Sequence, residues 1–184
     1  MKHCARILLC LLFPVLSHVL PAQTSYTVSQ SLDFWVSNTE KEVVSAADAM
    51  PAEKYSFAPT AGEFNGVRTF AQQVKHLAAN NYRMAAYMNG QTPTPDQEAE
   101  TGPETVTTKA QIMDYLKGSM TALHHAVAMV TKENMLEALG GRRPPRQNNR
   151  LQFAVDAVAH SYDHYGQMVE YLRMNGIVPP ASRR

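Results

Sequence analysis

Hydrophobic residues recur at helical spacing in four long segments of the chain, which predicts four α-helices. The segments span about residues 28–50, 66–88, 108–131 and 148–175. The apolar face of the first is formed by Leu32, Trp35, Val36, Val43 and Ala47. No segment alternates between apolar and polar residues for long enough to predict a β-strand. The pattern therefore predicts an all-α fold, a four-helix bundle.

Polar residues, prolines and glycines separate the predicted helices. Ser29 or Ser31 could cap the start of the first helix, and Pro51 is expected to end it. Residues 51–65 show no periodicity, which predicts a long connection between helices one and two. Gly90 suits the C-terminal cap of the second helix, because glycine readily adopts the left-handed conformation found there.

The N-terminus has the pattern of a secretory signal peptide. A short basic start precedes an apolar run at residues 7–20, and Ala22 offers a small residue for cleavage. The run is short and interrupted, whereas a membrane-spanning helix needs about 20 apolar residues. We therefore predict a signal peptide at residues 1–22 and an exported, periplasmic or secreted, domain at residues 23–184, with no membrane span in the mature chain. An uncleaved membrane anchor is the alternative.

The charge balance argues against a nucleic-acid partner. The 184 residues include 17 Lys and Arg and 16 Asp and Glu, a net charge of +1. Cleavage would remove Lys2 and Arg6, leaving 162 residues with 15 basic and 16 acidic side chains, a net charge of −1. A nucleic-acid-binding protein normally has a basic excess. Cleavage would also remove Cys4 and Cys10, the two cysteines, which excludes a disulfide scaffold or a cysteine-based zinc site in the mature domain.

Histidines supply the candidate chemistry. Five lie beyond the predicted signal peptide: His76, His124, His125, His160 and His164. His160 and His164 are four residues apart, so they share one helical face and could bind one metal ion. His76 lies at the flank of its own apolar face, a position that can meet other helices in a cleft. Ser161 follows His160 where a zinc metalloprotease motif requires glutamate, which argues against protease chemistry.

Other residues near these histidines in the sequence also bear on the candidate site, and some of them allow more than one interpretation. His124 lies nearer the apolar face than His125 and could serve as a fourth or substitute ligand, whereas His125 is expected to be solvated. Gln167 could support a metal ligand through a hydrogen bond, or simply bond one helix to another. Gly166 within a predicted helix suggests the close approach of a neighbouring helix.

Several short motifs occur in a fixed order along nearly all of the mature chain. They are Pro51-Ala52-Glu53-Lys54-Tyr55-Ser56-Phe57-Ala58-Pro59, Gly66-Val67, His76-Leu77-Ala78, His160-Ser161-Tyr162-Asp163-His164-Tyr165-Gly166-Gln167 and Tyr171-Leu172-Arg173. This ordered set resembles the DinB-like family. The resemblance implies a four-helix bundle with a long connection between its first two helices, and it also implies that the protein can form a homodimer.

The resemblance further implies a divalent metal ion, often nickel or zinc, held by His76, His160 and His164. Three imidazole ligands leave coordination positions open for substrate or for a reactive bound water. Characterised relatives include transferases and isomerases that use low-molecular-weight thiols. Tyr165 replaces an arginine that often precedes the Gly-Gln pair in the family. Such thiols are chiefly cytosolic, so that role fits an exported protein poorly.

Three functional hypotheses follow. The leading one is an exported metal-dependent enzyme with hydrolase-like or transferase-like chemistry on an unknown small-molecule substrate. The alternative is a non-enzymatic metal-binding or stress-response bundle. A purely structural bundle is the third, and it predicts that His76, His160 and His164 are dispersed rather than clustered.

Overall fold

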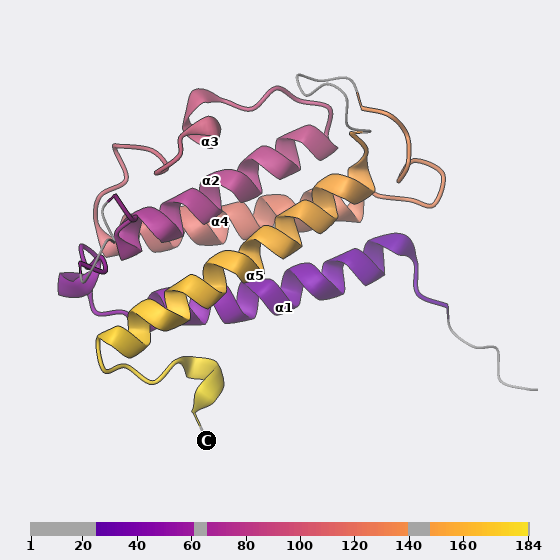
Figure 1. The fold of residues 1–184 in the computed structure, drawn as a ribbon. Helices are drawn as coiled ribbons and strands as arrows, with labels where there is room; N and C mark the ends of the chain where they lie inside the picture. The colour runs from indigo at the N-terminus through magenta and orange to yellow at the C-terminus, as the bar shows by residue number, and fades with distance from the viewer. Residues whose placement is uncertain (1–24, 61–65, 140–147, 184) are drawn as a thin grey trace, which may run out of the picture.

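Four long helices make up the bundle in the computed structural model, which describes residues 25–60, 66–139 and 148–183 (Figure 1). They are α1 (Val28–Ala49), α2 (Phe70–Met88), α4 (Lys109–Ala128) and α5 (Arg150–Met174). Shorter elements are η1 (Ala52–Lys54), α3 (Pro95–Glu98) and η2 (Pro180–Ser182). The described residues contain no strand, so the predicted all-α four-helix fold is confirmed. The predicted signal peptide lies outside the described residues.

Threonine caps set where three of the long helices begin. The side chains of Thr27, Thr69 and Thr108 each accept a hydrogen bond from the backbone N–H three residues later, and a glutamine there bonds back to the cap. The first helix is thus capped by Thr27, and the prediction of Ser29 or Ser31 was wrong. The second helix begins four residues later than predicted, because its cap lies within the predicted span.

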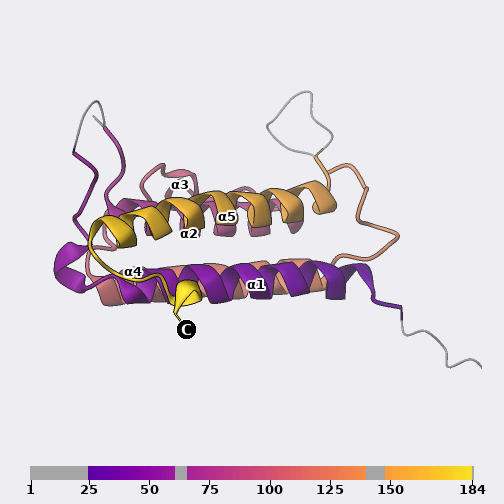
Figure 2. The same cartoon turned by 60° about the horizontal axis from the view of Figure 1, so that its bottom comes forward.

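The four helices form two layers, α1 with α4 and α2 with α5 (Figure 2). Helices α1 and α2 each pack against both α4 and α5. The predicted long connection joins α1 to α2. A second long connection, residues 89–108, returns along the bundle because α2 and α4 run in the same direction (Figure 1), and its short helix α3 packs on α2. This second connection also brings a main-chain oxygen into hydrogen-bond contact with a residue of the candidate site.

The core lies between the layers and follows the apolar faces of the helices. Its largest fully buried side chains include Phe70, Leu77, Leu116, Met120, Met168 and Leu172. Trp35, predicted in this core, is 51% exposed, because the neighbouring Val36 takes the inward position on α1. Within the described residues, no helix is both long enough and apolar enough to cross a membrane.

Gly166 does not mark a close helix approach. It is exposed, and a Cβ built on it would meet no atom within 4 Å. The prediction based on glycine within a helix was therefore wrong. The close contact lies instead at Gly118 on α4, where an added Cβ would collide with the hydroxyl of Tyr82 on α2.

Candidate metal centre

Three of the predicted histidines meet at one point between α2 and α5. His76 comes from α2, and His160 and His164 come from α5. Their candidate ligand atoms all lie within 4.8 Å of one another. The Nε2 atoms of His76 and His160 are 3.2 Å apart, and the ring centroids of His160 and His164 are 4.4 Å apart. The histidines cluster, as the two metal-binding hypotheses predict and the purely structural one does not.

Polar contacts along the α2–α5 interface hold the two helices in register around the cluster. On one side, the Ser161 hydroxyl donates to Asn81 Oδ1 across 3.4 Å, and Asn81 also donates to Ser119 on α4. On the other side, the Tyr171 hydroxyl donates to the main-chain oxygen of Arg68 across 2.8 Å. Because α2 and α5 run in opposite directions (Figure 1), these contacts join the two helices on either side of His76 and fix their approach.

Two of the rings are oriented by carbonyl oxygens at their Nδ1 atoms. His76 Nδ1 lies 2.7 Å from the main-chain oxygen of Glu100, and His164 Nδ1 lies 2.8 Å from Gln73 Oε1. A carbonyl oxygen only accepts hydrogen bonds, so both rings carry their proton on Nδ1. Their Nε2 lone pairs are then free to bind a metal, the arrangement that metal-ligating histidines usually show.

A chain of side-chain hydrogen bonds fixes the orientation of the Gln73 amide. Gln73 Nε2 donates to Gln167 Oε1 across 2.7 Å, and Gln167 Nε2 donates to Asp163 Oδ2 across 3.1 Å. The Asp163 carboxylate accepts only, which sets the direction of both amides and leaves Gln73 Oε1 facing His164. Gln167 therefore bonds one helix to another, as one of its two interpretations predicts, and it reaches His164 only through Gln73; its support of a metal ligand stays a prediction.

Glu100 reaches the cluster from the long connection between α2 and α4. Arg68 holds it there, since Arg68 Nε donates to the Glu100 main-chain oxygen and Arg68 Nη2 lies 2.6 Å from its carboxylate. Sequence reasoning missed Glu100 because its main-chain oxygen makes the contact, and any residue type provides that atom. It also missed Gln73, although the three-residue spacing from His76 places both on one face of α2.

The surroundings keep all three histidines neutral. Burial lowers the pKa of His76 and His160, and the Arg68 guanidinium also lowers both. Burial, with the nearby imidazoles of His160 and His76, lowers the pKa of His164 to about 3. A metal ion binds only the neutral imidazole, so the site has its ligands in the required protonation state near neutral pH.

The donor set and spacing fit a divalent transition metal. Two nitrogen ligands of a tetrahedral zinc ion, each about 2.0–2.1 Å from it, lie about 3.3 Å apart. The 3.2 Å between His76 and His160 Nε2 is close to this separation, and the ligand atoms of all three histidines lie within 4.8 Å of one another. Without metal, His160 donates the proton between these two atoms, because His76 Nε2 can only accept. Imidazole suits nickel and zinc, and three protein ligands leave further positions open.

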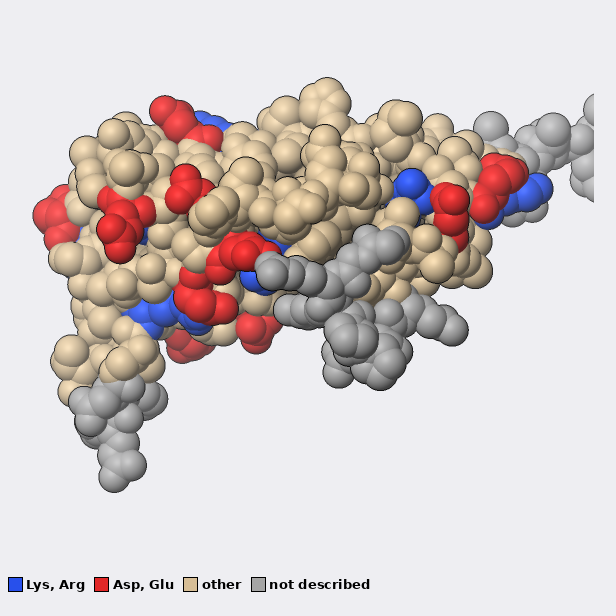
Figure 3. All heavy atoms as spheres, turned by 90° about the horizontal axis from the view of Figure 1, so that it is seen from above, with Lys and Arg blue, Asp and Glu red and all other residues tan. Residues whose placement is uncertain are grey.

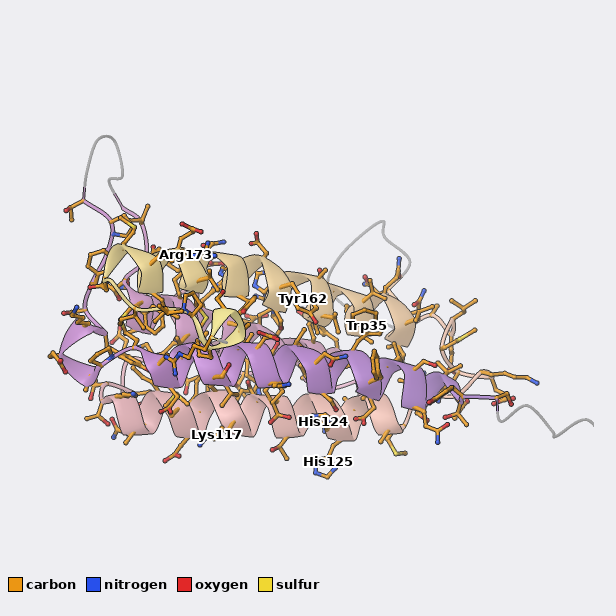
Figure 4. The ribbon with its side chains drawn as sticks, turned by 90° about the horizontal axis from the view of Figure 1, so that it is seen from below. Trp35, Lys117, His124, His125, Tyr162 and Arg173 are labelled. Atoms are coloured by element: carbon orange, nitrogen blue, oxygen red, sulfur yellow. The ribbon has the colours of Figure 1, made fainter. Side chains whose placement is uncertain are left out.

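His124 does not join the cluster, although it was predicted as a possible fourth or substitute ligand. It lies on α4, where its Nδ1 contacts Asp33 at 2.5 Å and its Nε2 contacts Glu40 at 3.1 Å, both on α1. These carboxylates raise its pKa despite the opposing effect of burial. His125 is exposed and points away from the bundle, as predicted (Figure 4).

An open pocket of about 430 Å³ lies beside the residues that orient two of the histidines. Its lining includes Arg68, Gln73, Glu100 and Gln167, the residues that support His76 and His164. The face of the molecule seen from above carries acidic and basic side chains close together rather than a broad patch of one sign (Figure 3). The pocket is large enough for a small molecule.

A comparison with protein families places the cluster in context. The family model described as the DinB superfamily matches residues 36–168, which include all three histidines and the residues that orient them. No curated protein sequence matches the chain.

Proposed function

Because the chain belongs to the DinB superfamily and brings three histidines together, we propose that it is a metal-dependent enzyme acting on a small molecule. The observation that carries the proposal is the geometry of His76, His160 and His164, with two Nε2 lone pairs freed by hydrogen bonds at Nδ1.

His76, His160 and His164 would hold nickel or zinc. When bound, such an ion supplies Lewis-acid chemistry suited to hydrolysis or group transfer. Gln73 and the Glu100 main chain keep two of the imidazoles in the ligating tautomer. The pocket lined by Arg68, Gln73 and Glu100 would give the substrate a place next to the residues that orient His76 and His164.

Metal analysis tests the site. The purified wild type, supplied with nickel or zinc, should retain one metal ion per chain, and a double variant with His160→Ala and His164→Ala should retain almost none. His125→Ala is the matched control, because His125 is an exposed histidine outside the cluster. Wild-type protein that stays metal-free, or metal that persists in the double variant, would refute the proposed site.

Catalysis needs a separate measurement. The metal-loaded wild type, the double variant and His125→Ala are compared on a panel of esters, amides and thiol-transfer acceptors. The proposal predicts turnover of at least one substrate by the wild type and the control, and none by the double variant. Stoichiometric metal binding without turnover across the panel would favour the non-enzymatic metal-binding alternative.

We also propose that the protein is exported after cleavage near Ala22, because residues 1–22 have the pattern of a signal peptide. The mass of the protein recovered from the periplasm or medium tests this, and it should correspond to a chain beginning at Gln23. Full-length protein in the cytoplasm would contradict it. The homodimer stays a prediction, which light scattering on the purified protein tests.

A further inference from the structure

Two hydrogen-bond donors near the histidine cluster lack an acceptor among the described residues. They are Asn80 Nδ2 and Arg83 Nε, and both atoms are buried. The whole Asn80 residue is only 3% exposed. A buried donor without an acceptor costs about 1–3 kcal/mol, so folded proteins rarely leave one unpaired. A ligand that supplies oxygen acceptors would remove this cost.

Both residues share the face of α2 that carries His76. Asn80 follows His76 by four residues and Arg83 by seven, which places all three on one side of the helix. At His76 that side faces α5, since His76 contacts His160. The unpaired donors therefore lie about one and two helical turns from His76 along the same face of α2.

The hydrogen bond between the two residues does not use Asn80 Nδ2 or Arg83 Nε, the two buried nitrogen atoms. Arg83 Nη2 donates to Asn80 Oδ1 across 2.6 Å, which fixes the amide so that its nitrogen faces away from that contact. The ion pairs among the described residues do not include Arg83, so no carboxylate neutralises it there. Its positive charge, close to a site for a divalent cation, favours a negatively charged ligand.

We propose that Asn80 and Arg83 bind a carboxylate group of the substrate beside the three histidines. The substrate would then be a small molecule that carries a carboxylate, which places its reacting group within reach of the metal centre. Guanidinium and amide N–H groups match the planar arrangement of carboxylate oxygens. This inference rests on the proposed function, since it names the substrate class of the same site.

Acetate and inorganic phosphate are the probes for this site. Binding of each is measured by calorimetric titration to the full mature protein, both zinc-loaded and metal-free. Asn80→Asp keeps the acceptor for Arg83 but replaces the free donor with an acceptor, and Arg83→Gln removes the charge. Each variant should weaken acetate binding by roughly 10- to 100-fold, the usual effect of a lost hydrogen bond to a charged group. Phosphate should bind more weakly than acetate to the wild type.

Arg173→Gln is the matched control, because Arg173 is an exposed arginine on α5, paired with Glu170 and outside this cluster (Figure 4). It should leave acetate binding unchanged. Equal acetate binding by the wild type and both variants, or no acetate binding by either form of the wild type, would overturn the proposal. Preferred binding of phosphate would overturn the carboxylate assignment. If Arg83→Gln fails to fold, Asn80→Asp alone decides.

Metal content measured on the same samples separates this inference from the proposed function. If the wild type retains no metal but its acetate binding depends on Asn80 and Arg83, the metal centre fails and the anion site stands. If metal binds normally and acetate binding ignores both residues, the anion site fails and the metal centre stands.

Discussion

Acidification should destabilise the metal-free protein through His164. The pKa of this histidine is lowered from 6.5 to about 3 by burial and by the neighbouring imidazoles. Between these values the unfolded chain binds a proton that the folded protein does not, so the stabilisation is full above the unfolded pKa and is lost as the pH falls below it. At about pH 5, roughly 1.5 pH units below the unfolded pKa, His164 costs about 2 kcal/mol of folding free energy.

Urea unfolding in the presence of a chelator measures this cost. The wild type, His164→Gln and the exposed-site control His125→Gln are unfolded at about pH 7.5 and about pH 5. The stability lost between the two pH values should be about 2 kcal/mol smaller in His164→Gln than in the wild type. The control should follow the wild type. An equal loss in the wild type and His164→Gln would refute the account of His164 as a buried neutral ligand.

Three further predictions concern single side chains. Gly166→Ala should stabilise the protein by about 1 kcal/mol, because the added Cβ meets open space. Gly118→Ala should not stabilise it, because the added Cβ collides with Tyr82. Thermal unfolding of the two variants distinguishes these outcomes. His124→Gln should cost more stability at about pH 6 than at about pH 8.5. The raised pKa of His124 stabilises the fold at low pH, and this contribution is lost as the pH rises. Urea unfolding at both pH values tests this difference. Gln73→Leu should weaken metal binding by about 10- to 100-fold in a chelator competition, because the imidazole of His164 loses the hydrogen bond that orients it. An unchanged metal affinity would contradict this role of Gln73.

The helices and the pairing of His160 with His164 on one face could be predicted because both depend on helical periodicity. Apolar residues at three- and four-residue spacing define the faces that meet in the core. The same spacing places His160 and His164 on one face of α5, and the resemblance to a known family adds His76. Periodicity indicates which residues share a face. It does not indicate which faces meet, so the meeting of His76 with the α5 pair needed the structure.

The remaining features depend on contacts that leave little trace in the sequence. Glu100 supports His76 through a main-chain oxygen, an atom common to every residue. His124 has the same side chain as the clustered histidines, but α4 places it between the acidic residues of α1. Trp35 is hydrophobic and at helical spacing, yet it lies at the surface between α1 and α5, on the side of Tyr162 (Figure 4). These outcomes are set by helix packing across the bundle.

Crystallographic location of the metal tests the central claim most directly. Anomalous scattering from the nickel- or zinc-loaded protein should show a single strong peak about 2.0–2.1 Å from the Nε2 atoms of His76, His160 and His164. A peak elsewhere, such as beside His124, or the absence of density among the three rings would contradict the metal centre.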